Sequence, residues 1–222
     1  MASQRLIAIG DIHGYRDALR ALLDAVRIQP DDTVVTLGDY VDRGPDSRGV
    51  FDELIALADH CELVPLRGNH DELFLEICCG ATVLMDDWLR FGGDTTVASY
   101  GGDLATGVPR EHLDFLHACP SIHEADAFFF VHGSYTADVP LNRQMPEVLH
   151  WESLRMRLPG PHGSGKTAIV GHTAQKDGEI LDLGYLKCID TFCYGGGWLT
   201  ALDVPSGQVW QVDQNGTLRP EA

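Results

Sequence analysis

The chain has little positive charge. Its 222 residues contain 16 lysines and arginines against 33 aspartates and glutamates, which gives a formal net charge of −17. This balance argues against nucleic acid or an anionic membrane as a partner, because binding to either uses an excess of cationic side chains. It does not exclude an anionic substrate, since bound divalent metals reverse the local electrostatic field. The simpler interpretation is that the acidity keeps the protein in solution.

Long apolar runs are missing as well. No stretch is long enough to span a bilayer, and the first residues do not form a charged-then-apolar secretion signal. The sequence therefore predicts a cytoplasmic protein without a membrane partner.

Cysteine is present, but not in the spacing of metal-binding or redox motifs. None of the six cysteines forms a C-x-x-C pair, and Cys78 and Cys79 are adjacent within an apolar helical pattern. A disulfide framework is not expected in a chain of this length without a secretion signal. We expect buried or partly buried thiols, with a redox pair of Cys188 and Cys193 as the alternative.

The first 80 residues alternate short apolar runs with amphipathic patterns. The runs at 6–9, 33–37 and 63–66 predict buried strands, and the patterns at 15–26, 47–58 and 71–79 predict helices. Asp46 or Ser47 is the expected N-cap of the second helix. Strands and helices in this order are typical of a parallel sheet with right-handed crossovers.

The remainder of the chain predicts a helical region followed by short strands. Helices are expected at 83–91, 95–100 and 109–118, as a layer over the site. Strands are expected at 127–131, 168–170, 180–183, 185–190, 198–204 and 208–213. Because short turns between close strands favour antiparallel hairpins, we expect a second sheet packed on the first as a sandwich with helices outside. No Gly/Ser/Pro linker divides the chain, so residues 1–222 are expected to form a single domain.

Polar residues able to bind metals follow five of these strands, each beside a glycine. They are Asp11, His13, Asp39, Asn69, His132 and His172. One such histidine alone is more often a hydrogen-bonded core residue, but core packing does not explain five strand-end motifs together. Mixed oxygen and nitrogen ligands without thiolate suit Mn, Fe, Zn or Co. Asp39 can bridge two ions through its two oxygens, so the six ligands fit two divalent metals with a hydroxide between them.

These motifs resemble those of the calcineurin-like metallophosphoesterases, and within them the bacterial PPP-type serine/threonine protein phosphatases. They are GDIHG at 10–14, GDYVDRG at 38–44, RGNH at 67–70, HG at 132–133 and GH at 171–172, with DT at 190–191 and GGWLT at 196–200. The resemblance implies an α/β (α+β) fold of four layers, a central β-sandwich flanked by helices. It also implies two metal sites that share Asp39. One adds Asp11 and His13, the other adds Asn69, His132 and His172, and manganese is the expected ion.

The resemblance implies catalytic roles for four further residues. His70 would act as general acid, and Asp42 would orient His70 and raise its pKa. Arg43 and Arg67 would clamp phosphoryl oxygens, to which arginine is suited by its two parallel N–H donors. Arg67 has the alternative role of bracing its own loop. Water would attack phosphorus directly, without a phosphoenzyme.

Two positions depart from the family pattern. A second phosphate-binding arginine usually lies in a Trp-x-Arg segment, but residues 151–153 are Trp-Glu-Ser, so Arg155 or Arg157 would have to replace it. The family usually has glutamate after Gly-Asn-His, where this chain has Asp71. Both departures bear on the substrate class more than on metal binding.

A P-loop pattern, GPHGSGKT, occupies residues 160–167. A functional P-loop opens a helix whose N-terminus holds phosphate. Here the segment leads directly into the strand expected at 168–170. We therefore expect a flexible loop and no nucleotide site.

The sequence favours a dinuclear-metal phosphomonoesterase that acts on phosphoserine or phosphothreonine in a protein or peptide, or on a small phosphoester. Hydrolysis of dinucleoside polyphosphates such as diadenosine tetraphosphate is the alternative, because related enzymes carry the same metal motifs. The segment YVDR at 40–43 favours the phosphatase. A catalytically inactive scaffold is a third hypothesis, against which the complete ligand set and His70 argue. The sequence assigns neither the oligomeric state nor the native metal.

Overall fold

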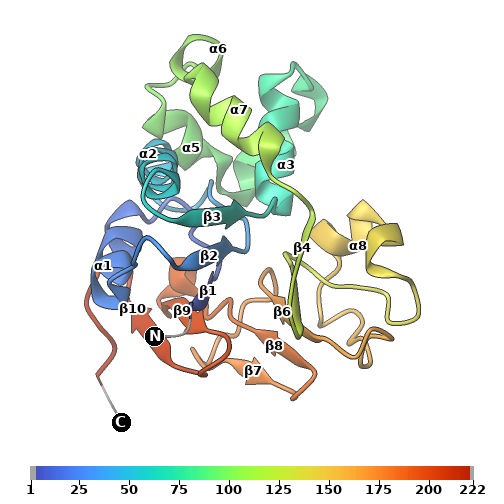
Figure 1. Ribbon diagram of the computed structural model, residues 1–222. Coiled ribbons are helices and arrows are strands. Elements are labelled where there is room, and N and C mark those ends of the chain that lie inside the picture. Colours follow the sequence, from blue (N-terminus) through green and yellow to red (C-terminus); the bar gives the residue numbers. More distant parts are fainter. Residues whose placement is uncertain (1–3, 221–222) are drawn as a thin grey trace.

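The computed structural model describes residues 4–220 and contains two five-stranded sheets packed face to face (Figure 1). The first sheet has the strand order β10-β9-β1-β2-β3. Its parallel part consists of β1 (Leu6–Ile9), β2 (Thr33–Thr36) and β3 (Glu62–Pro65). The antiparallel hairpin of β9 (Leu199–Asp203) and β10 (Val209–Val212) extends this sheet beyond β1.

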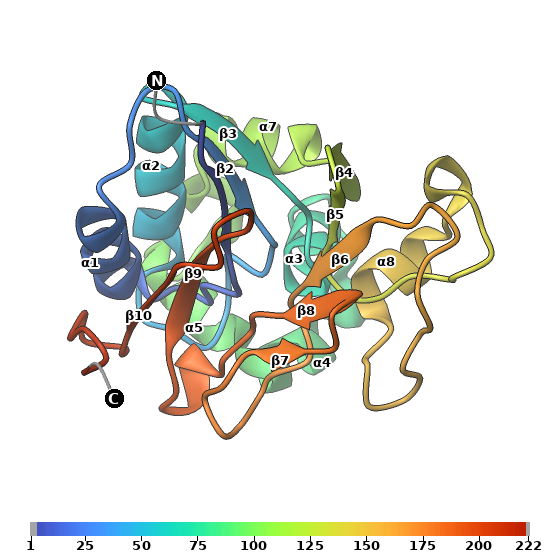
Figure 2. The same cartoon turned by 60° about the horizontal axis from the view of Figure 1, so that its bottom comes forward.

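Helices connect the parallel strands and cover the outer face of the first sheet (Figure 2). α1 (Arg16–Val26) and α2 (Ser47–Ala58) are the two crossovers, and α3 (Asn69–Cys78) follows β3. The Asp46 carboxylate caps α2 by accepting a hydrogen bond from the Gly49 N–H at 2.8 Å. The strand–helix alternation predicted for the first 80 residues is therefore confirmed.

A helical layer follows α3. It consists of η1 (Thr82–Leu84), α4 (Met85–Trp88), η2 (Leu89–Gly93), α5 (Asp94–Ser99), α6 (Leu104–Gly107) and α7 (Arg110–Ala118). The helix predicted at 83–91 is present as three contiguous short helical elements, and the chain turns at Gly92, where φ is 106°. A Cβ atom at Gly92 would lie 2.8 Å from Arg43 N. Glycine thus allows this layer to close against the loop after β2.

The second sheet has the order β4-β5-β6-β8-β7. Its strands are β4 (Ile122–Ala125), β5 (Phe128–Val131), β6 (Thr167–Val170), β7 (Leu181–Asp182) and β8 (Leu186–Cys188). η3 (Leu141–Arg143) and α8 (Pro146–Trp151) lie in the β5–β6 connection, and η4 (Cys193–Gly195) lies in the β8–β9 connection.

The antiparallel hairpins predicted for the closely spaced strands are confirmed at β7–β8 and β9–β10. The β9–β10 hairpin, however, belongs to the first sheet and not to the second, and the central strands β5, β6 and β8 of the second sheet are parallel. A hydrophobic pattern determines which face of a strand is buried, but not which strand lies beside it. Pairing with β9 covers the edge of β1 that the parallel strands leave open.

Alternating side chains divide the core into three layers. Along β1, Ile7 and Ile9 pack against the helices, whereas Leu6 and Ala8 face the second sheet. On β5 the same alternation points Phe130 between the sheets, and its neighbours pack outward beneath α8 and nearby loops. Successive side chains of a strand point to opposite faces, so both sheets are buried on both sides. This confirms the sandwich with flanking helices.

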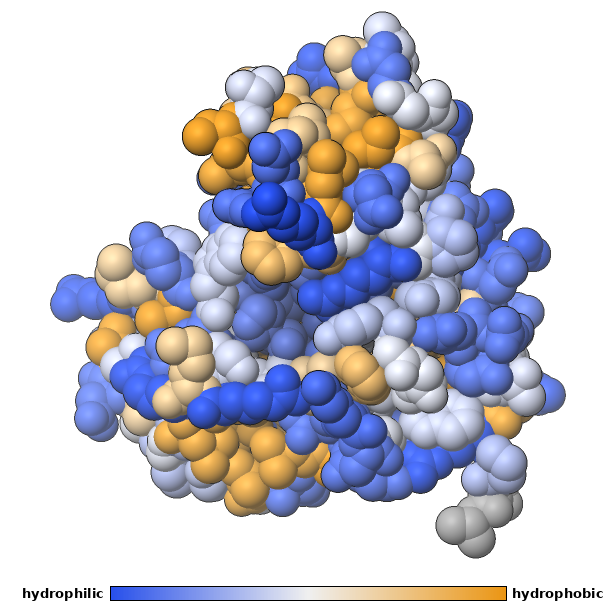
Figure 3. Space-filling view, turned by 180° about the vertical axis from the view of Figure 1, so that it is seen from behind, coloured by the Kyte–Doolittle hydropathy of each residue, from blue (hydrophilic) through white to orange (hydrophobic). Residues whose placement is uncertain are grey.

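The surface has apolar and polar regions on the same face. Seen from behind, apolar side chains gather over the helical layer at the top, and the middle of this face is hollowed (Figure 3). No helix in the described range combines the length and the apolar character needed to cross a bilayer. All six cysteines are free thiols, and the prediction of buried thiols is wrong for Cys79, which is exposed.

The P-loop-like segment is a connection between α8 and β6. β6 begins at Thr167, so the segment lacks the helix that a phosphate-binding loop precedes. The His162 ring is buried and lies 2.8 Å from Ser164 Oγ and 2.9 Å from Val139 O. These contacts hold the loop in place, contrary to the expected flexible loop.

Candidate metal centre and active site

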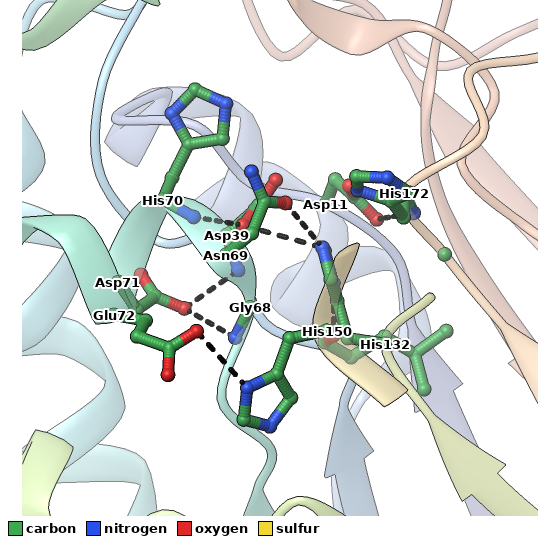
Figure 4. Close-up of polar contacts among 12 residues, drawn as sticks. Asp11, Asp39, Gly68, Asn69, His70, Asp71, Glu72, His132, His150 and His172 are labelled. Carbon is green, nitrogen blue, oxygen red and sulfur yellow. Dashed lines mark hydrogen bonds and ion pairs between the residues drawn. The ribbon is translucent and has the colours of Figure 1, made fainter. Parts of the chain in front are cut away.

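Loops from both sheets meet at one end of the sandwich (Figure 4). The strands β1, β2 and β3 lead into residues 10–14, 38–44 and 67–70, while β5 and β6 lead into His132 and His172. Parallel strands present their carboxyl ends at the same edge of a sheet. Parallel pairing gathers these loops at one edge of each sheet, and the packing of the two sheets joins residues as far as 161 positions apart, as in the contact between Asp11 and His172.

Asp39 lies at the centre of this edge and is only 2% exposed. Its Oδ2 is 3.5 Å from His13 Nε2, and its Oδ1 is 3.4 Å from His132 Nε2. Two groups of ligand atoms share this carboxylate, and within each group all atoms lie within 4.8 Å of one another. The groups are His13, Asp39 and His70, and Asp39, His132 and His172. Each oxygen of one carboxylate thus faces its own set of nitrogens.

The protonation of the histidines fits a pair of cations. His13 Nδ1 lies 2.9 Å from Val41 O and His132 Nδ1 lies 2.8 Å from Leu37 O, and a carbonyl oxygen only accepts, so both Nδ1 atoms carry hydrogen. Burial lowers the pKa of His13 well below its usual value and that of His132 to about 3, so both rings are neutral. Their Nε2 lone pairs then face Asp39 with no proton between them. Cations satisfy such facing acceptors, and backbone bonds at the other ring nitrogen are the usual support of histidine ligands.

Asn69 and Asp11 lie next to these two groups of ligand atoms and make different contacts with them. Asn69 Oδ1 lies 3.1 Å from His132 Nε2, as a second oxygen donor on that side. The Asp11 carboxylate accepts hydrogen bonds from the His172 backbone N–H, at 3.1 Å to each oxygen. Asp11 belongs to neither of the two compact groups, and His70 takes the place in the first group that the resemblance gives to Asp11.

Strained backbone accompanies the site. Five residues of these loops adopt positive φ without being glycine: His13, Asp39, Asp42, Arg43 and His172. Each such conformation costs about 1–3 kcal/mol, and strain of this kind gathers where a protein needs a side chain in one orientation. Gly68 permits the closest approach, since a Cβ there would lie 2.1 Å from Asp39 Oδ1.

Asp71 fastens the Asp39 loop to α3. Its buried carboxylate accepts hydrogen bonds from three backbone N–H groups, those of Asp39 at 2.8 Å, Tyr40 at 2.9 Å and Gly68 at 2.9 Å. Burial, aided by the charge of Asp39, raises the pKa of Asp71 to about 8. Asp71 stands where the family usually has glutamate. It is therefore still an acidic residue, and it holds the Asp39 loop.

Replacing Asp71 by alanine should destabilise both the fold and the site. Three buried N–H groups would lose their acceptor, and we expect a loss of about 3 kcal/mol in the free energy of unfolding. Urea unfolding measures this loss, and calorimetric titration with Mn²⁺ should show weaker binding. Asp71→Asn keeps one acceptor oxygen and should lose less. Equal stability of Asp71→Ala and the wild type would contradict this role.

His70 is held by a buried carboxylate. Its Nδ1 lies 2.6 Å from Asp42 Oδ2, which also accepts a hydrogen bond from Trp88 Nε1 at 2.9 Å. Thr96 Oγ1 donates to the other oxygen of Asp42 at 2.8 Å. Burial acts to lower the pKa of His70, but the charges of Asp39 and Asp42 outweigh burial and raise it. The imidazolium form is therefore stabilised beside the Asp39 cluster.

Arg43 connects the two parts of the site. Its Nη1 lies 2.6 Å from His13 Nε2, and its Nη2 lies 2.9 Å from His70 Nε2. The guanidinium thus points both at a nitrogen of the candidate metal set and at the outer nitrogen of His70.

The other arginines lie elsewhere. Arg67 Nη2 donates to Leu116 O at 2.6 Å, at the end of α7, which matches the bracing alternative. Arg155 donates to Ala174 O, two residues beyond His172. Arg157 is half exposed and pairs with Glu152. Of the two candidates for the missing family arginine, Arg155 is the one attached to a strand-end loop.

Three contributors to this site were not predicted from the sequence. Trp88 and Thr96 hydrogen-bond to Asp42 from the helical layer, and the Tyr194 ring lies against Arg43. Trp88 and Thr96 belong to segments with ordinary helical patterns, which carry no sign of a partner about 50 positions away. Tyr194 follows the DT motif but belongs to no motif itself.

Comparison with known proteins agrees with this geometry. Residues 4–198 match the family model described as calcineurin-like phosphoesterase. A protein of Salmonella typhimurium named serine/threonine-protein phosphatase 1 is 37% identical over 209 residues, covering 86% of this chain and 88% of that protein. A protein of Salmonella arizonae named symmetrical bis(5'-nucleosyl)-tetraphosphatase is 44% identical over 259 positions, covering 87% and 89%.

A solved structure leads to the same group of proteins. It belongs to a protein suggested to be a diadenosine tetraphosphatase and superimposes with a TM-score of 0.71 at 25% identity, covering 95% of this chain and 94% of that one. The family match, the relatives and the arrangement of strand-end loops agree. This chain is therefore a member of the calcineurin-like phosphoesterases, of the PPP type.

Proposed function

We propose that the protein is a dinuclear-metal phosphomonoesterase that removes phosphate from serine or threonine side chains. The observation that carries the proposal is the fork of Arg43, whose two Nη atoms contact His13 of the candidate metal set and His70, the candidate general acid. A cation clamp, a carboxylate-supported histidine and a metal-type ligand cluster are the parts that phosphoester hydrolysis needs. They lie together at one edge of the sandwich.

The ligand set that we propose consists of Asp11, His13, Asp39, Asn69, His132 and His172. Two divalent ions bound there, manganese by preference, would lower the pKa of a water and neutralise phosphoryl oxygens. Asp39 would belong to both ligand sets. The neutral rings of His13 and His132 would each offer an Nε2 lone pair, held in direction by the backbone bond at Nδ1.

His70 would donate the proton that the leaving alkoxide needs. The Asp42 carboxylate holds Nδ1, which turns Nε2 toward Arg43 and the substrate position. The charges of Asp39 and Asp42 raise the pKa of the ring, which favours the protonated form that a general acid needs. Arg43 would bind the phosphoryl oxygens, and we assign Arg67 to bracing the α7 end against the Asn69 loop. No serine or cysteine nucleophile is needed.

Segments within the aligned region favour the protein phosphatase over the tetraphosphatase. The alignment to the Salmonella arizonae tetraphosphatase spans 259 positions while covering only 87% of this chain, so that relative carries segments inside the aligned region that this chain lacks. The alignment to the Salmonella typhimurium phosphatase fits within 209 positions. Additional segments around the site would be a means of recognising a nucleotide.

Hydrolysis of dinucleoside polyphosphates is the second candidate. It is favoured by the 44% identity to that tetraphosphatase and by the solved neighbour suggested to be a diadenosine tetraphosphatase, which is nearly the same length as this chain. The same metal cluster and the same acid would serve both reactions. Only the groups that bind the remainder of the substrate would differ.

A substrate panel separates the two candidates. Protein stripped by a chelator and reloaded with Mn²⁺ is assayed on a phosphoserine peptide, a phosphothreonine peptide and diadenosine tetraphosphate. We expect kcat/KM for the peptides to exceed that for the dinucleotide by about tenfold or more, a difference of roughly 1.4 kcal/mol in transition-state binding. Cleavage of the dinucleotide alone would overturn the phosphatase assignment. Full activity in the stripped protein would overturn the metal mechanism.

A further inference from the structure

Arg43 is held without a carboxylate partner. Within residues 4–220 no carboxylate oxygen lies within 4 Å of its guanidinium, although the other well-ordered arginines of α1 and the chain ends form such pairs. Its only hydrogen-bond contacts through the side chain are the two histidine nitrogens. Its backbone N–H donates to Gly92 O at 3.0 Å, which fixes the backbone of Arg43 against the helical layer. The orientation of the guanidinium must therefore come from contacts other than an ion pair.

The Tyr194 ring packs against the guanidinium of Arg43. Arg43 Cζ lies 3.9 Å from the centre of the ring, which is a close cation–π contact. The same ring meets His13 edge-on, with centroids 5.1 Å apart at an interplanar angle of 83°. Tyr194 is half-buried, so one side of the ring covers these two residues.

The loop that carries Tyr194 is tightly built. Phe192 has φ 68°, in the left-handed region, and its ring packs edge-on against Tyr194 with centroids 4.8 Å apart. Gly197 N donates to Phe192 O and Trp198 N donates to Thr191 O, both at 2.9 Å. The loop then enters β9, which pairs with β1, the strand that leads to His13. Tyr194 thus precedes β9 and Arg43 follows β2, the two strands that flank β1 in the first sheet.

A stacked aromatic ring leaves different parts of the guanidinium accessible than an ion pair does. A carboxylate partner would occupy the in-plane N–H donors and cancel the charge. An aromatic ring contacts only the flat face of the guanidinium, so it does not cancel the charge and leaves the in-plane N–H donors to other acceptors, which here are the two histidine nitrogens. The stack also allows the guanidinium to slide parallel to the ring while its tilt stays constrained.

We propose that Tyr194 is a positioning residue for Arg43, which holds the guanidinium by its face so that both Nη atoms point at the phosphoryl group. This inference rests on the proposed function for the identity of the anion. Tyr194 itself touches no reacting atom. Its effect passes entirely through Arg43.

The test uses inorganic phosphate as the probe, because phosphate binding needs no turnover. Orthophosphate affinity of the Mn²⁺-loaded full chain is measured by calorimetry for Tyr194→Phe, Tyr194→Leu, Arg43→Ala and the double variant. Tyr194→Phe keeps the ring and should bind within about twofold of the wild type. Tyr194→Leu removes the π face and should weaken binding about threefold to tenfold. KM for a phosphopeptide should rise by a similar factor with a smaller change in kcat.

The double variant separates positioning from packing. If Tyr194 acts through Arg43, Tyr194→Leu should have no further effect in the Arg43→Ala background, because the two changes remove one interaction. Additive losses would overturn the inference, as would unchanged phosphate affinity in Tyr194→Leu. Tyr194→Met, which is apolar and adaptable in shape, replaces Tyr194→Leu if the latter does not fold. Bound manganese per chain should be the same in all variants.

The outcome is distinguishable from failure of the proposed function. A chain that binds orthophosphate through Arg43 and Tyr194 but hydrolyses no phosphopeptide would retain the inference and lose the substrate assignment. A wild-type chain that does not bind orthophosphate would overturn the inference directly.

Discussion

Asp39→Asn should lose at least one of two bound Mn²⁺ ions and about a thousandfold or more of its phosphatase activity. The substitution keeps the shape of the side chain but removes the negative charge that two groups of ligand atoms share. Burial acts to raise the pKa of Asp39, but His70, whose own pKa is raised, is among the neighbours that lower it below its usual value, so the wild-type residue is a carboxylate. A loss of this size is what removal of a principal electrostatic stabiliser causes in other enzymes. Metal analysis after dialysis and kcat on a phosphopeptide measure both effects.

Asp32→Asn is the matched control for this experiment. Asp32 is a buried carboxylate just before β2, at the opposite end of the strand from Asp39, and Arg5 Nε donates to its Oδ1 at 2.9 Å. Its replacement should lower the free energy of unfolding and leave the bound manganese and kcat of the folded protein unchanged. Asp39→Asn with two tightly bound ions and normal kcat would remove the basis of the dinuclear site.

His70→Asn should slow hydrolysis of alkyl phosphates such as phosphoserine about 10²- to 10⁴-fold, the usual contribution of a general acid. An aryl phosphate releases a weakly basic leaving group that needs little protonation, so its hydrolysis should fall much less. The ratio of kcat for the two substrates is the measured quantity. The acid lies in place because Asp42 holds Nδ1, while Trp88 and Thr96 hold Asp42.

His112→Asn provides the control for a general loss of a buried histidine. His112 Nε2 lies 3.1 Å from Asp52 Oδ1 and its Nδ1 lies 2.9 Å from the Tyr100 hydroxyl, away from the strand-end loops. We expect lower stability and an unchanged ratio between alkyl and aryl substrates. If His70→Asn lowered both substrates equally, His70 would position Arg43 or a metal and would not be the proton donor.

Much of the site could be predicted because its signals are local. Each candidate ligand follows a short apolar run and has a glycine beside it, and a strand end followed by a turn is a pattern of a few residues. The same reasoning found the N-cap at Asp46 and the hairpin of β9 and β10. It also separated the P-loop-like segment from a true one by the element that follows it.

The predictions failed where the answer depended on distant partners. The hairpin at 199–212 was assigned to the second sheet, but its partner is β1, nearly 200 residues earlier. The turn at Gly92 that ends the helical stretch was expected, but its contact with Arg43 was not, because helical periodicity does not reveal such a contact. The hydrogen bonds of Asp71 to the Asp39 loop were missed for the same reason.

The sequence by itself determined the chemistry of the site: which side chains end the strands, that they are oxygen and nitrogen donors, and that the chain resembles a phosphoesterase family. Only the tertiary structure decided which of these side chains contact one another. It places His70 beside His13 and Asp39, and Asp11 against the His172 backbone. It also attaches Arg67 to the end of α7 and places Tyr194 against Arg43. The physical reason is the separation along the sequence over which each kind of signal acts. Residue type and spacing act within a few positions, whereas the contacts between these side chains arise from pairing and packing of strands and helices that local patterns leave open.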